Sequence, residues 1–426
     1  MNADSLDRPR HVVFASRHCL IDYSSGAAIA TNDCLQLLAR SGFRCQAFCA
    51  GAVDFQEEVC LERMLARLQI PFETLRETAG GRPVELIRTR CGAVPVTVFR
   101  NPSSRRGPGR DEAPAFLAAL EAFLERSRPD VVLTYGGGPL SEAIVALAQQ
   151  HRAALVFALK NLAYRHARTF QNVDCVFVPS AYARDYYRAR LGLKCAVLPN
   201  AIDPLRVQAA VRRPQYLTFV NPQPAKGLFV FARIAEQIAR RRPDIPMLVV
   251  DSRGGHKGLA NTGVDLRAAN NLFGMPNTPD PRMFYAVTKV ILVPSLVAEA
   301  FGNVAAEAML NGIPVLASTR GALPETVGQG GILLDIPPQY TPRSTVAPTA
   351  GEVEPWVDTV LRLWDDDAFY RAQAGKARHE SQRWQLERIG PVVVHFFRNV
   401  RPRSAHSTQD ASRRESPPRI DTDPQG

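Results

Sequence analysis

The stretch that decides the fold runs from residue 294 to residue 318 and reads PSLVAEAFGNVAAEAMLNGIPVLAS. The apolar run KVILVPS leads into it, and its last six residues, IPVLAS, form a second apolar run. Between the two runs, NVAAEAMLNG has helical spacing and closes on Asn-Gly, a helix stop signal. A buried strand, a loop, a helix and another buried strand in this order predict one unit of a parallel sheet.

Two glutamates flank the start of that helix. Glu299 lies in the loop that leaves the first strand, Glu307 lies one turn into the helix, and Phe301, Gly302 and Asn303 stand between them. The free N–H groups of a helix start bind phosphate, and a glycine lets the ligand come close to the backbone. Carboxylates accept hydrogen bonds from hydroxyl groups. Phosphate in the middle and a polyol at each end describe a nucleotide sugar, although the spacing alone also fits two surface glutamates around an ordinary turn.

Outward from this unit, apolar runs and helical patterns alternate in both halves of the chain. This alternation predicts an α/β fold with two Rossmann-like domains, each a doubly wound parallel sheet covered on both faces. The predicted strands lie at 11–16, 45–51, 84–100 (a strand pair), 174–180, 194–203, 215–222 and 289–295, with further short runs between them.

Composition shifts along the chain predict its domain boundaries. Residues 1–10 are polar and are expected to be disordered. An N-terminal domain on the acceptor side is predicted over 11–204, and a C-terminal donor-binding domain over 205–375. A C-terminal helix over 376–400 is expected to return to the N-terminal domain. The Ser- and Pro-rich stretch 401–426 has almost nothing to bury and is predicted to be a disordered tail.

Length and composition exclude several classes of protein. The chain has 426 residues, 46% of them hydrophobic and 22% charged, which excludes a mostly disordered chain, a collagen or a coiled coil. Only six of the 52 basic residues are lysine, so the net charge of +11 comes almost entirely from arginine. The excess is spread along the chain, and no aromatic-basic RNA motif or helix-turn-helix signature accompanies it, so we expect no nucleic-acid partner.

The cysteines and the apolar runs point to a cytoplasmic protein. None of the eight cysteines forms a Cys-x-x-Cys pair, which disfavours a disulfide framework or a zinc site and favours reduced thiols. The first ten residues hold no apolar run, so we expect no signal peptide. No apolar run approaches the roughly 18 residues that a membrane-spanning helix needs, which leaves peripheral contact with the inner face of a membrane compatible with the sequence.

The stretch 294–318 resembles the retaining glycosyltransferases of family 4 (group 1). Their motif has the form PS-x4-E-x-FG-x4-E-A-x3-G-x-PV, and the likeness extends over about residues 10–400. The resemblance implies a GT-B architecture, in which two Rossmann-like domains face each other across a cleft. It also implies that Glu299 binds the donor hexose, that Glu307 binds the ribose hydroxyls, and that backbone amides at Phe301, Gly302 and Asn303 meet the sugar or the diphosphate. The matching positions are Pro294, Ser295, Glu299, Phe301, Gly302, Glu307, Ala308, Gly312, Pro314 and Val315.

A second site region is FVNPQPAKG, 219–227. The family usually shows Arg-x4-Lys-Gly here, with both cations on the diphosphate. The chain keeps Lys226 and Gly227 but has Asn221 where the arginine is expected. Arg253, at the end of the next predicted strand, is a candidate for the missing cation; the other interpretation is a solvated loop arginine.

The remaining candidates come from three loops. Ser25 and Gly26 stand where family members have a Gly-Gly turn that touches phosphate or acceptor, and the turn around Gly137 is predicted to line the acceptor site. Lys160, followed by Asn161, stands at a strand end where the family often has a histidine near the donor sugar. A further candidate, for packing on the donor base, is Met275.

The resemblance predicts a retaining glycosyltransferase that needs no metal and no cofactor, with a nucleotide diphosphate sugar as co-substrate. No Asp-x-Asp pair stands where it would hold Mg²⁺, so charge on the leaving group would be met by Lys226 and helix amides. The acceptor stays open: a glycan, a lipid-linked sugar, a small metabolite or a protein. The alternative is a non-catalytic GT-B sugar-nucleotide binder or partner subunit, and a GT-B phosphorylase or epimerase is a third possibility.

Overall fold

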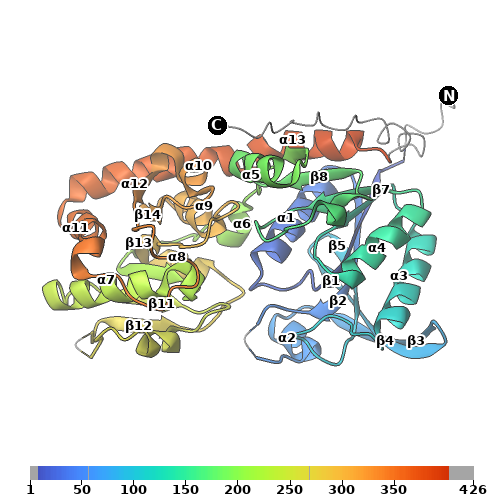
Figure 1. Cartoon of the computed structure of the whole chain (residues 1–426), viewed down its shortest axis with the longest axis horizontal. Helices are drawn as coiled ribbons and strands as arrows, with labels where there is room; N and C mark the ends of the chain where they lie inside the picture. Colours follow the sequence, from blue (N-terminus) through green and yellow to red (C-terminus); the bar gives the residue numbers. More distant parts are fainter. Residues whose placement is uncertain (1–7, 56, 268, 403–426) are drawn as a thin grey trace, which may run out of the picture.

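Two sheets, one in each lobe, organise the computed structural model, which describes residues 8–55, 57–267 and 269–402. Figure 1 shows the lobes side by side, with the N-terminal half of the chain on the right and the C-terminal half on the left. Of the two segments expected to be disordered, residues 1–7 and 403–426 lie outside the described residues. The expectation is wrong for residues 8–10, because Arg8 pairs with Asp130 and Arg10 donates to the backbone oxygen of Arg398.

The N-terminal sheet has nine strands in the order β3-β4-β5-β2-β1-β6-β7-β8-β9. All neighbouring strands are parallel except for the antiparallel pairs β3–β4 and β4–β5. Strand β3 is absent from the predicted pattern because FETLRETA is polar and largely exposed. The strands are β1 (His11–His18), β2 (Arg44–Ala52), β3 (Phe72–Ala79), β4 (Arg82–Cys91), β5 (Val94–Phe99), β6 (Val131–Thr134), β7 (Ala154–Ala158), β8 (Cys175–Val178) and β9 (Cys195–Val197).

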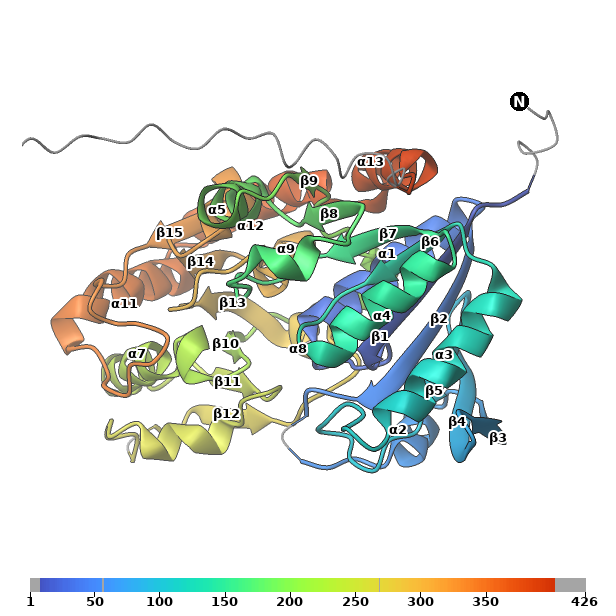
Figure 2. The ribbon, with the colours of Figure 1, turned by 45° about the vertical axis from the view of Figure 1, so that its right-hand side comes forward.

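Helices cover both faces of this sheet. Val13 and Phe48 pack with α3 and α4 on one face. Val12 and Phe14 lie in the core on the other face, which α1 and α13 (Leu386–Asn399) cover. Figure 2 shows α3 and α4 in front of the strands. Because successive residues of β1 are buried on opposite faces, the strand reads as a continuous apolar run. The helices are α1 (Gly26–Arg40), α2 (Leu61–Arg67), α3 (Ala113–Ser127), α4 (Pro139–Gln150) and α5 (Ala181–Leu191).

The C-terminal sheet has six strands, all parallel, in the order β12-β11-β10-β13-β14-β15. Phe219 of β10 stacks on Phe231 of α7 with ring centroids 4.7 Å apart, and Trp356 of α11 is buried in the same core. The strands are β10 (Tyr216–Val220), β11 (Met247–Val250), β12 (Leu272–Met275), β13 (Thr288–Val293), β14 (Val315–Ser318) and β15 (Gly331–Leu334). The helices are α6 (Pro204–Val207), α7 (Leu228–Arg241), α8 (Arg282–Val287), α9 (Asn303–Leu310), α10 (Leu323–Val327), α11 (Ala350–Asp365), α12 (Asp367–Ser381) and α13 (Leu386–Asn399).

Helix α13, red in Figure 1, ends the described chain against the N-terminal lobe. Its Phe397 is fully buried and meets Phe177 of β8 with ring centroids 6.4 Å apart, and its neighbour Phe396 meets the same ring at 6.0 Å. The guanidinium of Arg10 donates to the backbone oxygens of Arg398 and Val400. The last helix of the described residues therefore belongs to the core of the first lobe.

Further contacts fix one lobe against the other. The carboxylate of Glu325 in α10 accepts from the backbone amides of Ala181 and Tyr182, both at 2.9 Å, and so caps α5 of the opposite lobe. The hydroxyl of Ser180 donates to the backbone oxygen of Ala300 at 2.7 Å. These bonds join the two lobes directly.

Within the residues that the structure describes, no helix is both long and apolar enough to cross a membrane. The same residues contain no group of three or more His, Cys, Asp and Glu side chains arranged to hold a metal ion. All eight cysteines are free thiols.

We predict that Phe397→Ala destabilises the protein by about 3–5 kcal/mol, because it removes a buried ring and leaves a cavity between α13 and β8. Val392→Ala, on the same helix but 49% exposed, is the control and should change stability by no more than about 0.5 kcal/mol. Urea unfolding followed by circular dichroism measures both. Equal midpoints for the two variants would show that α13 does not contribute to the N-terminal core.

Candidate active site

A cavity of about 1050 Å³ lies between the lobes. Val220, Val250 and Val293, the last residues of β10, β11 and β13, line it from the C-terminal lobe, and the segment after β7 lines it from the N-terminal lobe. Ligands of open parallel sheets bind at the carboxyl ends of the strands, so the cavity lies where such a fold places its site.

Most of the residues that the sequence predicts for the site line this cavity. Ser25, Gly137, Gly227 and Met275 do not. Those that do are Gly26, Lys160, Asn161, Asn221, Lys226, Arg253, Glu299, Phe301, Gly302, Asn303 and Glu307.

Glu299 and Lys226 form an ion pair inside the cavity. The Nζ of Lys226 lies 2.6 Å from Oε1 of Glu299, and the hydroxyl of Ser295 donates to the same oxygen at 2.6 Å. The side chain of Glu299 is 14% exposed and that of Lys226 is 30% exposed. Both protein contacts fall on Oε1, so Oε2 is left to accept hydrogen bonds from a ligand's hydroxyl groups.

The start of α9 presents backbone donors to the same cavity. Gly302 precedes the helix with φ of 104°, and a Cβ there would lie 2.7 Å from the side chain of Leu323. Only glycine fits this left-handed and crowded position. Within the described residues, the amides of Asn303 and Val304 have no hydrogen-bond partner, so they are free to bind an anion at a helix start.

Gly227 does not line the cavity; it lies where the loop of Lys226 packs on the loop of Glu299. It has φ of 93°, and a Cβ there would lie 2.0 Å from the backbone oxygen of Pro294. The amides of Leu296 and Val297 donate to the backbone oxygen of Ala225 at 3.0 and 2.9 Å. The loop that carries Lys226 is thus packed directly on the loop that carries Glu299, which places their side chains in contact.

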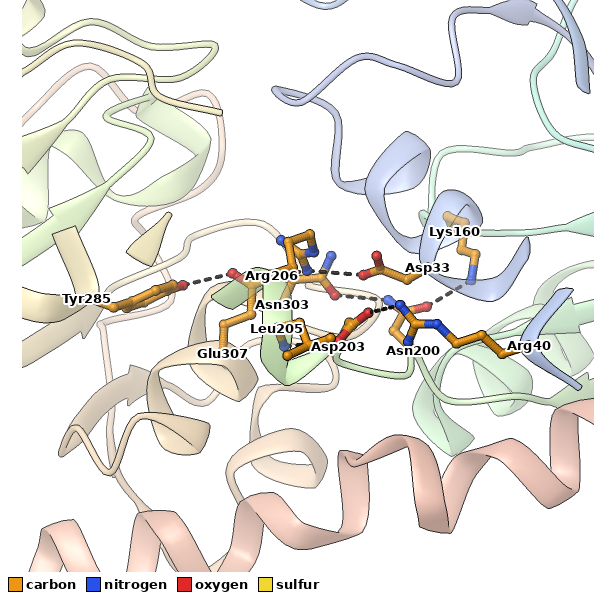
Figure 3. Close-up of polar contacts among 10 residues, drawn as sticks. All are labelled: Asp33, Arg40, Lys160, Asn200, Asp203, Leu205, Arg206, Tyr285, Asn303 and Glu307. Carbon is orange, nitrogen blue, oxygen red and sulfur yellow. Dashed lines mark hydrogen bonds and ion pairs between the residues drawn. The ribbon is translucent and has the colours of Figure 1, made fainter. Parts of the chain in front are cut away.

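Glu307 is held by two side chains that the sequence analysis did not single out. Its Oε1 accepts from Nη2 of Arg206 at 2.8 Å, and its Oε2 accepts from the hydroxyl of Tyr285 at 2.9 Å (Figure 3). The same Nη2 lies 3.1 Å from Asp33 of α1 in the other lobe. One guanidinium therefore bridges carboxylates from both lobes.

Lys160 belongs to a second chain of contacts across the cleft. Its Nζ donates to Asn200 at 2.8 Å, and the amide of Asn200 donates to the side chain of Asn303 at 2.9 Å (Figure 3). The ammonium also lies 4.8 Å from the ring centre of Phe177. Burial lowers the pKa of Lys160 to about 8. Lys160 thus connects the N-terminal lobe to the start of α9.

Asn221 and Arg253, the two residues considered for the family's second cation, both make contacts within the protein. Asn221 has φ of 63°, and its side-chain oxygen accepts from the amide of Gly254 at 3.1 Å, so it holds two loops together rather than supplying a charge. Arg253 reaches across the cleft, where its guanidinium pairs with Asp54 and donates to the hydroxyl of Ser25 at 3.1 Å.

Of the other predicted loop residues, Gly26 lines the cavity, whereas Gly137 and Met275 do not. A Cβ on Gly26 would lie 3.5 Å from the side-chain nitrogen of Asn303, which places this loop beside the start of α9. The turn around Gly137 is tied to Tyr164, whose hydroxyl accepts from the amide of Gly136 at 3.2 Å, away from the cavity lining. Met275 ends β12 and packs on the core, while Asn277, Thr278 and Pro279 line the cavity beyond it.

Two family models match the chain. "Glycosyltransferase Family 4" matches residues 24–206, and "Glycosyl transferases group 1" matches residues 214–366, so together they cover most of both lobes. The chain belongs to the group 1 glycosyltransferases.

Curated relatives of this group 1 glycosyltransferase match it over shorter stretches. The lipopolysaccharide 1,2-N-acetylglucosaminetransferase of Salmonella typhimurium is 30% identical over 178 residues, 36% of this chain and 46% of that protein. The D-inositol 3-phosphate glycosyltransferase of Segniliparus rotundus is 32% identical over 130 residues, 28% of this chain and 29% of that protein. The chain spans less than half the length of either relative.

Solved structures match the group 1 chain over nearly its whole length. Sucrose-phosphate synthase from Thermosynechococcus elongatus and HepE from Anabaena, the latter in complex with UDP-glucose, each have a TM-score of 0.63 and 16% sequence identity. Each comparison covers 91% of this chain, with 98% and 99% of the respective structure. The fold is the GT-B fold that the resemblance implies.

No motif in the sequence points to Arg206, Tyr285 and Asp33, which contact Glu307 or connect it to the other lobe. Arg206 is 101 residues from Glu307 and 173 residues from Asp33, so no local spacing connects them. The only local signal is Asp203 followed by proline, which predicts the short helix that carries the arginine.

We predict a pH-dependent effect of Asp33→Asn on stability. Burial raises the pKa of Asp33 to about 6, although Arg206 opposes the shift. The folded state therefore favours the protonated carboxyl, and this stabilisation, fully present below about pH 4, is lost as the pH rises through 6. The asparagine cannot ionise, so its stability relative to the wild type should increase by roughly 1–3 kcal/mol between pH 4 and pH 7.

Urea unfolding of both proteins at several pH values measures this difference. A difference that stays constant across the range would contradict the assignment of a raised pKa to Asp33.

Proposed function

We propose that the protein is a retaining, metal-independent glycosyltransferase that moves a hexose from a nucleoside diphosphate sugar to an acceptor hydroxyl. The observation that carries the proposal is the contact between Lys226 and Glu299 beside the free amides of α9. A cation, backbone donors and a carboxylate therefore lie within one cavity.

Each part of such a donor has a matching group. Glu307 would accept from the ribose hydroxyls, since its carboxylate lines the cavity and two fixed contacts orient it. Lys226 and the amides of Asn303 and Val304 would bind the diphosphate. Glu299 would accept from hexose hydroxyls through the oxygen that the protein leaves unpaired.

The same groups would stabilise the departing nucleotide. In the proposed step, the bond between the anomeric carbon and the β-phosphate oxygen breaks, and the acceptor oxygen forms its bond on the same face of the sugar. The acceptor's proton passes to the departing phosphate oxygen. Lys226 and the α9 amides are in place before the charge develops, which is electrostatic preorganisation.

Similar proteins that were solved with nucleotides or nucleotide sugars support a nucleotide-sugar donor in general. HepE was solved with UDP-glucose and with UDP and glucose, and the pneumococcal O-GlcNAc transferase GtfA was solved with UDP and GlcNAc. We propose that this chain also uses a nucleotide-sugar donor. We further propose that it is located in the cytoplasm and contacts the membrane peripherally. The acceptor class, whether glycan, lipid-linked sugar, small metabolite or protein, stays open.

A second candidate function is a non-catalytic sugar-nucleotide binder or partner subunit. The observation that favours it is Asn221, which has taken a structural role at the position of the family's second phosphate-binding cation. The two candidates differ in one readout: the binder would bind nucleotide sugars without hydrolysing or transferring them.

We predict that Glu299→Gln lowers kcat/KM on the order of 10²-fold, about 2.7 kcal/mol of transition-state stabilisation, because the neutral amide loses the ion pair with Lys226 and keeps only one, weaker acceptor oxygen. Glu307→Gln should have an effect of similar size through the ribose. Donors are first chosen by thermal shift from UDP-, GDP- and dTDP-sugars, and turnover is then measured as release of the free nucleotide.

Glu354→Gln is the matched control, since this glutamate is exposed on α11 and pairs with Arg241. It should keep wild-type turnover. Near-wild-type turnover in both site variants would refute the site assignment, and binding without any turnover in the wild type would favour the non-catalytic candidate.

We predict that turnover persists in EDTA, because Lys226 and the α9 amides supply the charge stabilisation that a divalent cation supplies elsewhere. The measurement compares nucleotide release before and after chelation, and after addition of Mg²⁺ or Mn²⁺. Loss of turnover on chelation that either ion restores would contradict metal independence.

A further inference from the structure

Arg206 lies on α6, the four-residue helix that follows the N-terminal lobe, and its side chain is 24% exposed. A single nitrogen, Nη2, contacts Glu307 of the C-terminal lobe at 2.8 Å and Asp33 of the N-terminal lobe at 3.1 Å. Figure 3 shows the guanidinium between the two carboxylates, with Tyr285 on the far side of Glu307. Arg206 also lines the cavity itself.

These contacts leave the carboxylate of Glu307 with free hydrogen-bond acceptor positions. A carboxylate offers about four acceptor positions. Arg206 takes one on Oε1 and Tyr285 takes one on Oε2, so each oxygen keeps one position for a ligand. Two fixed donors on different oxygens also prevent the carboxylate from turning about its terminal bond, so its remaining acceptor positions keep one direction in the cavity.

The guanidinium of Arg206 makes both of its carboxylate contacts through one nitrogen, Nη2. Its Nε is buried, and within the described residues it has no hydrogen-bond partner. Because the contact to Asp33 uses the nitrogen that also pairs with Glu307, one donor atom ties the Glu307 carboxylate to the opposite lobe.

We propose that Arg206 is a positioning residue for the donor ribose, which it serves by fixing the carboxylate of Glu307 while Asp33 ties it to the opposite lobe. The inference rests on the proposed function. It assigns nucleoside recognition to a residue of the interlobe segment, outside the motif 294–318, and it makes that recognition depend on the position of both lobes.

The test is discrimination between ribose and deoxyribose. UDP and 2′-deoxy-UDP are titrated into the wild type, Arg206→Met and Arg206→Lys by calorimetry; GDP and 2′-deoxy-GDP replace them if the wild type binds the guanine nucleotide instead. The wild type should bind the ribonucleotide about 10-fold more tightly, the equivalent of about 1.4 kcal/mol for one hydrogen-bonded hydroxyl. Arg206→Met should bring the ratio to within about 2-fold, and Arg206→Lys should give an intermediate ratio.

Arg40→Met is the matched control. Arg40 pairs with Asp203 at 2.9 Å in the same network and contacts neither Glu307 nor Asp33 in the structure, so its loss should leave the discrimination ratio at the wild-type value. If Arg206→Met does not fold, Tyr285→Phe replaces it: removal of one hydroxyl from the same carboxylate should also lower the ratio.

The outcomes separate the two proposals. Retention of the wild-type ratio in a folded Arg206→Met, or an equal loss of discrimination in Arg40→Met, would overturn the role of Arg206 and leave the proposed function intact. A wild type that binds none of UDP, GDP and dTDP would overturn the proposed function, and the role of Arg206 with it. A wild type that binds dTDP alone would overturn the role of Arg206 and leave the proposed function intact.

Discussion

The packing of the Lys226 loop on the Glu299 loop is the constraint on which the rest of the site depends. Gly227 lies so close to Pro294 that no side chain fits between the two loops, and backbone hydrogen bonds from Leu296 and Val297 close the contact. The ion pair of Lys226 with Glu299 forms on top of this backbone contact. Because both loops leave the carboxyl ends of neighbouring strands, β10 and β13, the sheet itself positions the charged pair.

The second determinant is the way the lobes are joined. The segment after the N-terminal lobe contributes Asn200, Asp203 and Arg206, and each of them contacts a residue of one or both lobes. Glu325 and Ser180 add direct contacts farther from the cavity. The groups that line the cavity from the two lobes are therefore held in position relative to one another by hydrogen bonds.

The sequence could predict the parts of the site that lie close together in the chain. The two glutamates, Gly302 and the helix start fall within a single strand-loop-helix unit, where hydrophobic periodicity and the family resemblance both apply. It could not predict the partners of Glu307, because Arg206 and Asp33 come from distant elements and meet only when both lobes have folded. Strand β3 was missed because its side chains alternate little and face solvent on the edge of the sheet.

The central claim is that this cavity binds a nucleoside diphosphate in one defined direction, and a crystal structure of the protein soaked with UDP tests it most directly. The account predicts the ribose hydroxyls within hydrogen-bond distance of Glu307, with Arg206 and Tyr285 still in contact with that carboxylate, and the diphosphate between Lys226 and the amides of Asn303 and Val304. Density for UDP elsewhere, or a ribose that does not touch Glu307, would contradict it.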